Sequence, residues 1–131
     1  MTVGVLLLTH EGIGTSLMRV ARRLFGAEPE LPLDAYEATW DDDADTQLPA
    51  ASAALRRVDR GDGVLLLVDL YGATPARIAA RLAQLGTPAK RVSGLGLPML
   101  LRVLNYPEQP LDELARTAAA GARNGVVVDD A

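Results

Sequence analysis

The stretch VGVLLLTH, residues 3–10, decides how the rest of the chain is interpreted. Its apolar residues run without a break up to Thr9 and His10, and glycines follow at positions 12 and 14. A short apolar run with such an end is typical of a strand that is covered on both faces of a sheet. We therefore expect His10, the only histidine, at the carboxyl end of a buried strand, where the ligand sites of open α/β sheets collect.

A second apolar run, VLLLV at residues 64–68, ends in the same way at Asp69. If the two strands are neighbours, as in the flavodoxin-like order, their axes lie about 5 Å apart and the side chains of His10 and Asp69 can touch. A carboxylate that accepts one hydrogen bond from an imidazole fixes its tautomer and leaves the other ring nitrogen as a nucleophile. We therefore predict that His10 carries a phosphoryl group and that Asp69 orients it.

Two helix starts are expected beside this pair, after residues 14–16 and after residues 72–74. The first turn of a helix has backbone N–H groups without partners and the positive end of the helix dipole. Thr74 followed by Pro75 is a strong start signal, with Thr74 as the N-cap. Together the two helix starts predict a site for a small dianion bound to His10.

Amphipathic and apolar patterns alternate along the chain and predict its fold class. The polar content of residues 33–38 favours an edge position for that strand. Besides the two runs above, strands are expected at 33–38, 91–93 and 125–128, and helices at 17–25, 47–58, 75–85, 99–104 and 111–123. This order predicts a single α/β domain over residues 1–131. It is a three-layer sandwich around a mostly parallel sheet of four strands, with a further short strand at the C-terminus.

Composition excludes several classes of function. The chain has 13 basic and 17 acidic residues, a net charge of −4 and no basic stripe with interleaved aromatic residues, which argues against a nucleic-acid partner. Without cysteine there is no disulfide, thiolate metal site or cysteine nucleophile. The apolar runs are far shorter than the ~18 residues of a membrane span, and the start lacks the features of a signal peptide. We expect a cytoplasmic protein that is not embedded in a membrane.

No nucleotide, cofactor or metal is expected. A Gly-x-x-x-x-Gly-Lys-Ser/Thr loop is absent and the only lysine is Lys90, so the phosphoryl group has to come already activated from another protein. The acidic residues 41–45 lack the spacing of a calcium-binding loop and suit the start of a helix instead. Trp40, which precedes them, is interpreted as a packing anchor.

Three separated blocks resemble a known family: VLLLTHEG at residues 5–12, LLVDLYGATP at residues 66–75 and GLGLPML at residues 94–100. They are similar, in the same order, to segments of the mannose-type enzyme IIA of the bacterial phosphoenolpyruvate-dependent sugar phosphotransferase system. The resemblance implies that His10 accepts a phosphoryl group from the histidine phosphocarrier protein and passes it to an enzyme IIB component, for sugar uptake or for regulation. It also implies a homodimer in which the last strand, residues 125–128, crosses to the partner's sheet.

The resemblance assigns roles to individual residues as well. It implies that Asp69 orients His10, and that Gly72, Ala73 and Thr74 bind the phosphoryl group. Other residues are expected in the site loops or on the partner surface: Glu11, Gly12, Tyr71, Arg77, Gly96, Pro98 and Met99.

Three positions depart from the family pattern. Ala73 replaces a glycine and Arg77 replaces an asparagine, which is expected to alter phosphate contacts or partner choice. Gly96 replaces another asparagine, which removes a polar side chain beside the site. The histidine chemistry is expected to survive all three replacements.

Two alternative functions remain open at this level. An aspartate that ends the third strand is also typical of receiver domains, which would be phosphorylated on Asp69. Receivers, however, require an acidic pair after the first strand, where only Glu11 stands, and a lysine after the fifth strand, whereas no lysine follows Lys90. The other alternative is a non-catalytic module that binds partners through the same crevice.

Overall fold

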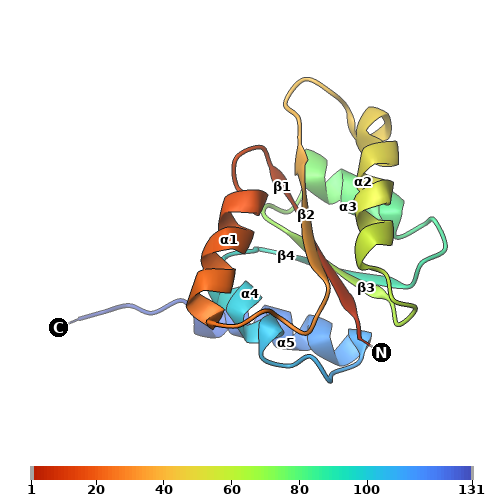
Figure 1. The fold of residues 1–131 in the computed structure, drawn as a ribbon. Coiled ribbons are helices and arrows are strands. Elements are labelled where there is room, and N and C mark those ends of the chain that lie inside the picture. Colours follow the sequence, from red (N-terminus) through yellow and green to blue (C-terminus); the bar gives the residue numbers. More distant parts are fainter. Residues whose placement is uncertain (1, 131) are drawn as a thin grey trace.

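The computed structural model describes residues 2–130, and its centre is a sheet of four parallel strands in the order β2-β1-β3-β4 (Figure 1). Helices α1, α4 and α5 cover one face of the sheet, and α2 and α3 cover the other. The predicted α/β sandwich is therefore confirmed. In chain order the elements are β1 (Gly4–His10), α1 (Gly14–Phe25), β2 (Leu33–Ala38), α2 (Ala44–Val58), β3 (Val64–Val68), α3 (Thr74–Leu82), β4 (Ala89–Ser93), α4 (Leu97–Leu104) and α5 (Leu111–Asn124).

The two apolar runs form the central strands β1 and β3 because their side chains are buried on both faces of the sheet. Leu7 faces the core beneath α1, α4 and α5, while Leu8 faces the core beneath α2 and α3. Leu8 is paired with Val68 in the parallel register, so the two strands end side by side. The adjacency of the first and third strands, on which the predicted contact between His10 and Asp69 depends, is confirmed.

Strand β2 lies at one edge of the sheet, as its polar residues predicted. Its last residue, Ala38, is paired with His10. The loop that follows Ala38 therefore starts at the carboxyl edge of the sheet, directly beside the end of β1. None of the helices in the described part of the chain has the length and apolar character that crossing a membrane requires.

The helix boundaries differ from the predicted ones at several ends. Helix α2 begins at Ala44 because the side chain of Asp43 accepts a hydrogen bond from the backbone N–H of Thr46 at 2.8 Å and caps the first turn. This hydrogen bond lowers the pKa of Asp43. The acidic stretch before α2 therefore works as a helix start, as the sequence indicated.

Helix α3 begins at Thr74, one residue earlier than predicted. Ala73, not Thr74, occupies the N-cap position, while Pro75 lies in the first turn as expected. The hydroxyl of Thr74, now in the first turn, accepts a hydrogen bond from the side chain of Arg77 at 3.0 Å. The helix ends at Leu82, which is earlier than predicted.

The predicted strand at residues 125–128 is not present in this single chain. After α5 the backbone of these residues has no regular secondary structure, and the tail leads away from the body of the fold (Figure 1). Val126, Val127 and Val128 are 78, 76 and 83% exposed. A strand needs a neighbour for its backbone hydrogen bonds, and one chain supplies none here. Exchange of this segment in a dimer stays a prediction.

Candidate functional site

The side chains of His10 and Asp69 meet at the carboxyl edge of the sheet. Nδ1 of His10 lies 2.8 Å from Oδ2 of Asp69, and the same oxygen accepts the backbone N–H of His10 at 2.9 Å. The imidazole is 20% exposed and the carboxylate 9% exposed. The predicted pair is thus formed, with Asp69 largely buried and the ring of His10 reaching the surface.

This geometry determines which ring nitrogen of His10 keeps its lone pair. A carboxylate oxygen only accepts hydrogen bonds, so the Nδ1 atom beside it carries the proton. In the neutral ring the lone pair is then on Nε2, at the far side from Asp69. The arrangement presents a nucleophilic nitrogen whose ring is held at a fixed orientation.

Thr9 and Gly14 set the turn that follows His10. The buried hydroxyl of Thr9 donates to the carbonyl of His10 at 2.8 Å and accepts the backbone N–H of Gly14 at 2.8 Å. A Cβ on Gly14 would lie 2.9 Å from that hydroxyl and 3.3 Å from Cβ of Ala35. Only glycine therefore lets α1 begin this close to β1.

The start of α1 is already partly occupied, whereas the prediction left its backbone N–H groups to an anion. The carboxylate of Glu37, on the neighbouring strand β2, accepts the backbone N–H groups of Gly12 at 2.9 Å and Thr15 at 2.8 Å. These two hydrogen bonds lower the pKa of Glu37. An acidic side chain of the protein itself thus occupies the positive end of this helix.

The start of α3 is arranged differently and fits the prediction better. Gly72 has a φ of +85°, a conformation that L-residues rarely adopt, and its loop turns into the helix at Ala73. Among the hydrogen bonds of the described residues, none uses the backbone N–H groups of Gly72, Ala73 or Thr74. Arg77 donates from Nη1 to the carbonyl of Gly72 at 3.2 Å and from Nη2 to the hydroxyl of Thr74. Arg77 thus holds the loop before α3 in place, and the backbone N–H groups of this loop remain free to donate to an anion.

Trp40 is the site residue that the sequence interpretation missed. Its ring centroid lies 5.1 Å from that of His10, with the ring planes tilted by 34°. The indole is 71% exposed, so the packing-anchor interpretation is wrong. The available signal was its position two residues after β2, whose last residue is paired with His10.

Residues 4–118 match the family model EIIA-man, described as the PTS system fructose IIA component. The chain belongs to this family. The resemblance that the three sequence blocks indicated is therefore confirmed, and the domain is an enzyme IIA of the mannose type.

Individual relatives agree with this assignment. The mannose-specific EIIAB component of the phosphotransferase system of Escherichia coli K12 is 27% identical over 128 residues, which are 96% of this chain and 39% of that protein. The enzyme IIA chain thus spans about 39% of the length of this relative.

Solved structures share the fold. The mannose/sorbose-specific IIA subunit from Enterococcus faecalis superposes with a TM-score of 0.85 at 24% identity, covering 100% of this chain and 97% of that one. The component EIIA from Streptococcus agalactiae gives a TM-score of 0.80 at 18% identity, covering 96% of both chains.

The remaining predicted residues of this enzyme IIA separate into two groups. Glu11, Gly12, Tyr71 and Pro98 are exposed, and Gly96 is the N-cap of α4, so all five lie in loops or helix starts at the same edge of the sheet as His10. Met99 does not fit the prediction. Its side chain is fully buried in the core between the sheet and the helices α1, α4 and α5, so it packs and does not reach a partner.

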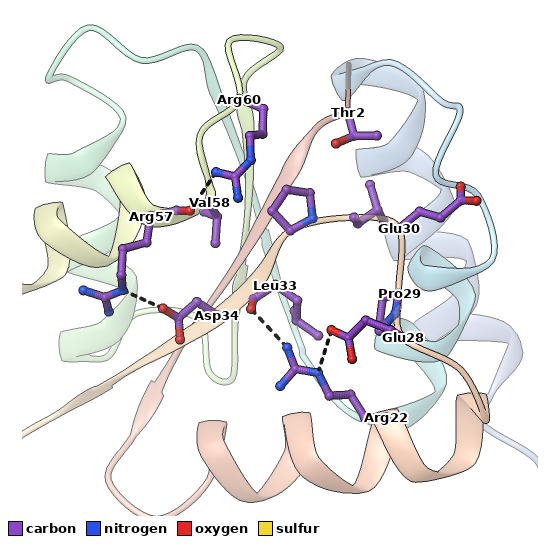
Figure 2. Close-up of a pocket in the computed structure, with 12 residues that line it drawn as sticks. Thr2, Arg22, Glu28, Pro29, Glu30, Leu33, Asp34, Arg57, Val58 and Arg60 are labelled. Carbon is purple, nitrogen blue, oxygen red and sulfur yellow. Dashed lines mark hydrogen bonds and ion pairs between the residues drawn. The ribbon is translucent and has the colours of Figure 1, made fainter.

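A cavity of about 610 Å³ lies at the opposite edge of the sheet, near the starts of β1 and β2 (Figure 2). Its charges compensate one another: Arg57 is 2.8 Å from Asp34, and Arg22 is 3.9 Å from Glu28 (Figure 2). Arg60 donates to a backbone carbonyl at 2.8 Å. This cavity is not lined by His10 or Asp69, which lie at the other edge of the sheet.

No group of three or more His, Asp or Glu side chains within residues 2–130 is placed to hold a metal ion. Three of the four acidic residues before and in α2, Asp42, Asp43 and Asp45, have other partners. Asp42 accepts from the hydroxyl of Thr39 at 2.9 Å, and Asp45 is paired with Arg81.

Proposed function

We propose that this enzyme IIA carries a phosphoryl group on Nε2 of His10, which it accepts from the histidine phosphocarrier protein and passes to an enzyme IIB component. The observation that carries the proposal is the 2.8 Å contact between Nδ1 of His10 and Oδ2 of Asp69. The chain works in the cytoplasm, either in sugar uptake or in its regulation, and it uses no metal or cofactor of its own.

In the transfer step, the lone pair of Nε2 attacks phosphorus on the donor phosphohistidine. The bond between Nε2 and phosphorus forms while the bond between phosphorus and the donor nitrogen breaks, and the donor imidazole keeps that electron pair. When the other nitrogen of the donor ring is protonated, the donor leaves as a neutral imidazole. The proton on Nδ1 of His10 stays between the ring and Asp69, which offsets the positive charge of the phosphorylated ring. When the group passes to enzyme IIB, a nucleophilic side chain of that component attacks phosphorus, and the bond to Nε2 breaks with His10 keeping the electron pair.

The start of α3 receives the phosphoryl oxygens. Its free backbone N–H groups at Gly72, Ala73 and Thr74 point from the positive end of a nine-residue helix, which favours a dianion. Because the hydroxyl of Thr74 accepts a hydrogen bond from Arg77, its own hydrogen is free to donate to a phosphoryl oxygen. The guanidinium of Arg77 adds a positive charge that the family's usual asparagine lacks.

The surface around His10 suits a protein donor better than a small molecule. Large apolar side chains are exposed in the loops that follow β1, β2 and β3. They are Ile13 at 42%, Trp40 at 71%, Leu70 at 59% and Tyr71 at 85%. Exposed apolar groups gathered at one edge of a domain mark a protein contact surface. The Escherichia coli relative is an EIIAB component, whose name joins a IIA with a IIB part, and this supports an enzyme IIB acceptor.

The receiver alternative receives little support from this geometry. In a receiver, an oxygen of Asp69 would have to attack phosphorus, but Oδ2 already accepts two hydrogen bonds from His10 and Oδ1, which has no hydrogen-bond partner among the described residues, is buried away from the surface. A hydroxylamine-sensitive phosphate that requires magnesium would favour the receiver. The non-catalytic alternative predicts that replacing His10 leaves partner affinity and cellular phenotype intact.

The test is transfer of ³²P from phosphorylated histidine phosphocarrier protein to the full chain without added metal. We expect an acid-labile, base-stable label that His10→Ala abolishes and that added enzyme IIB discharges. Labelling that persists in His10→Ala would contradict the proposal. His10→Ala must first be shown to unfold at a temperature close to that of the wild type, so that loss of label reports chemistry.

A further inference from the structure

Trp40 is exposed, which is unusual for a tryptophan, and its loop is held in place by hydrogen bonds. At 71% exposure the indole contributes little to the core, yet it lies within 5.1 Å of the His10 ring. Aromatic pairs at such separations attract one another beyond simple burial. The indole is therefore placed to affect the His10 ring and contributes little to the packing of the fold.

The loop that carries Trp40 is fastened by one buried side chain. Gln47, which is 4% exposed, accepts the backbone N–H of Thr39 at 2.8 Å and donates to the carbonyls of Thr39 at 3.3 Å and Asp42 at 2.9 Å. The hydroxyl of Tyr36 donates to the same amide oxygen at 2.8 Å. Gln47 thus holds the loop on both sides of Trp40, which places the indole against His10 without burying it.

Asp69 alone leaves one motion of the imidazole unconstrained. Its hydrogen bond at Nδ1 fixes that corner of the ring, but the ring can still tilt about this contact and move Nε2. A side chain on one face of the ring limits the tilt. Trp40 is the aromatic residue in contact with His10 among the described residues.

The phosphorylated ring gives the contact a second role. With phosphorus on Nε2 and a proton on Nδ1, the imidazole carries a positive charge. The face of an indole attracts a cation within about 6 Å of its centroid, and tryptophan does so best. Trp40 is therefore placed to favour the charged, phosphorylated ring over the neutral one.

We propose that Trp40 is a positioning residue for His10: its indole covers one face of the imidazole and, together with Asp69, keeps Nε2 turned toward the incoming phosphoryl group. The kinetic consequence rests on the proposed function, whereas the contact itself does not. A tenfold loss of transfer rate is in the range expected when a reacting group is misoriented, and about that loss is expected without the indole.

The first test is NMR of the full chain, labelled at its single histidine. The ring current of Trp40 is expected to shift the His10 ring protons upfield, and Trp40→Ala is expected to remove that shift. Tyr106→Ala removes a partly exposed aromatic side chain beyond α4 and should leave the shift in place. Ring protons that are unaffected by Trp40→Ala would overturn the proposal, whether or not His10 is ever phosphorylated.

The second test separates positioning from docking. Single-turnover transfer is measured at increasing concentrations of phosphorylated phosphocarrier protein. Trp40→Ala is expected to lower the maximal rate about tenfold with little change in the half-saturating donor concentration, and Trp40→Phe should recover most of the rate. A change in the half-saturating concentration alone would make Trp40 a docking residue and overturn the proposal. If the ring-current shift is present but no variant or wild type is labelled, the proposed function fails and the contact stands.

Discussion

One carboxylate oxygen of Asp69 accepts both the ring Nδ1–H and the backbone N–H of His10, at 2.8 and 2.9 Å. The second contact fixes the carboxylate relative to the end of β1, and the first fixes the ring relative to the carboxylate. The ends of β1 and β3, which are far apart in the sequence, are thereby linked through Oδ2 of Asp69. The tautomer of His10 follows from this arrangement, because Oδ2 offers only lone pairs.

Asp69→Asn is expected to slow phosphoryl transfer by a factor on the order of a hundred or more. An amide can turn its NH₂ group toward Nδ1, which moves the ring proton to Nε2 and removes the nucleophilic lone pair. The measurement is the single-turnover rate from the phosphorylated phosphocarrier protein. Asp34→Asn, a carboxylate paired with Arg57 at the other edge of the sheet, serves as the matched control and should transfer normally. Equal rates for Asp69→Asn and wild type would show that the carboxylate does not set the tautomer.

Arg77→Gln is expected to lower the transfer rate about tenfold or more, because it removes a charge and releases both Gly72 and Thr74. Arg81→Gln, one turn further along α3 and paired with Asp45, is the control for loss of a charge on this helix. In a double-mutant cycle, the losses of Arg77→Gln and Thr74→Val should be less than additive. Fully additive losses would indicate that Arg77 does not act through Thr74.

Glu37→Gln is expected to destabilise the fold by about 1 kcal/mol or less, since one of two hydrogen bonds to the start of α1 is lost at a partly exposed site. The pKa of Glu37 is lowered from its ordinary value of 4.5, so its contribution is present above that pH and is lost as the pH falls through the lowered value. The difference in unfolding free energy between wild type and variant should therefore be largest near pH 7 and should decrease at acidic pH. Glu30→Gln, an exposed carboxylate for which the structure shows no hydrogen bond or ion pair, should show no such pH dependence.

Gly14→Ala is expected to destabilise the fold by about 1–3 kcal/mol, as overpacking of tight sites does. The new methyl group would lie 2.9 Å from the Thr9 hydroxyl that links β1 to α1. Chemical denaturation checks this, with Gly96→Ala as the control, because a Cβ there would meet only Cδ of Pro98, at 3.7 Å. Similar stabilities of the two variants would mean that the turn after His10 tolerates a side chain.

The chain is expected to form a dimer through residues 125–128, and Val127→Asp is expected to shift it toward the monomer. Val127 is 76% exposed in the single chain, so a charge there costs nothing unless the segment is covered by a partner. Sedimentation velocity across a range of concentrations measures the shift. A wild type that is monomeric at high concentration would contradict the strand exchange.

The central strands and the positions of His10 and Asp69 at their ends could be predicted because the responsible signals are local. An apolar run of strand length has to be covered on both faces, and a polar residue at its end has to lie at an edge of the sheet. Residues 3–10 and 64–68 carry both signals, so His10 and Asp69 were placed correctly relative to their strands. The polar pattern of β2 predicted its edge position in the same way.

The surroundings of the histidine could not be predicted, because they depend on contacts between segments distant in the sequence. Glu37 reaches the start of α1 only because β2 lies beside β1, and Trp40 reaches His10 only because Gln47 holds the loop after β2. Met99 belongs to a motif block that predicted a site role, yet the packing of α4 on the sheet turns its side chain into the core.

By itself, the amino-acid sequence determined the strands and helices of the sandwich in chain order and placed His10 and Asp69 at the ends of its two central strands. Periodicity and strand ends are properties of a few neighbouring residues, so they can be recognised without coordinates. Only the tertiary structure decided which helix start remains open to an anion and which side chain covers the imidazole. A hydrogen bond or ring contact depends on separations of a few ångströms between strands and loops, and no local pattern encodes these.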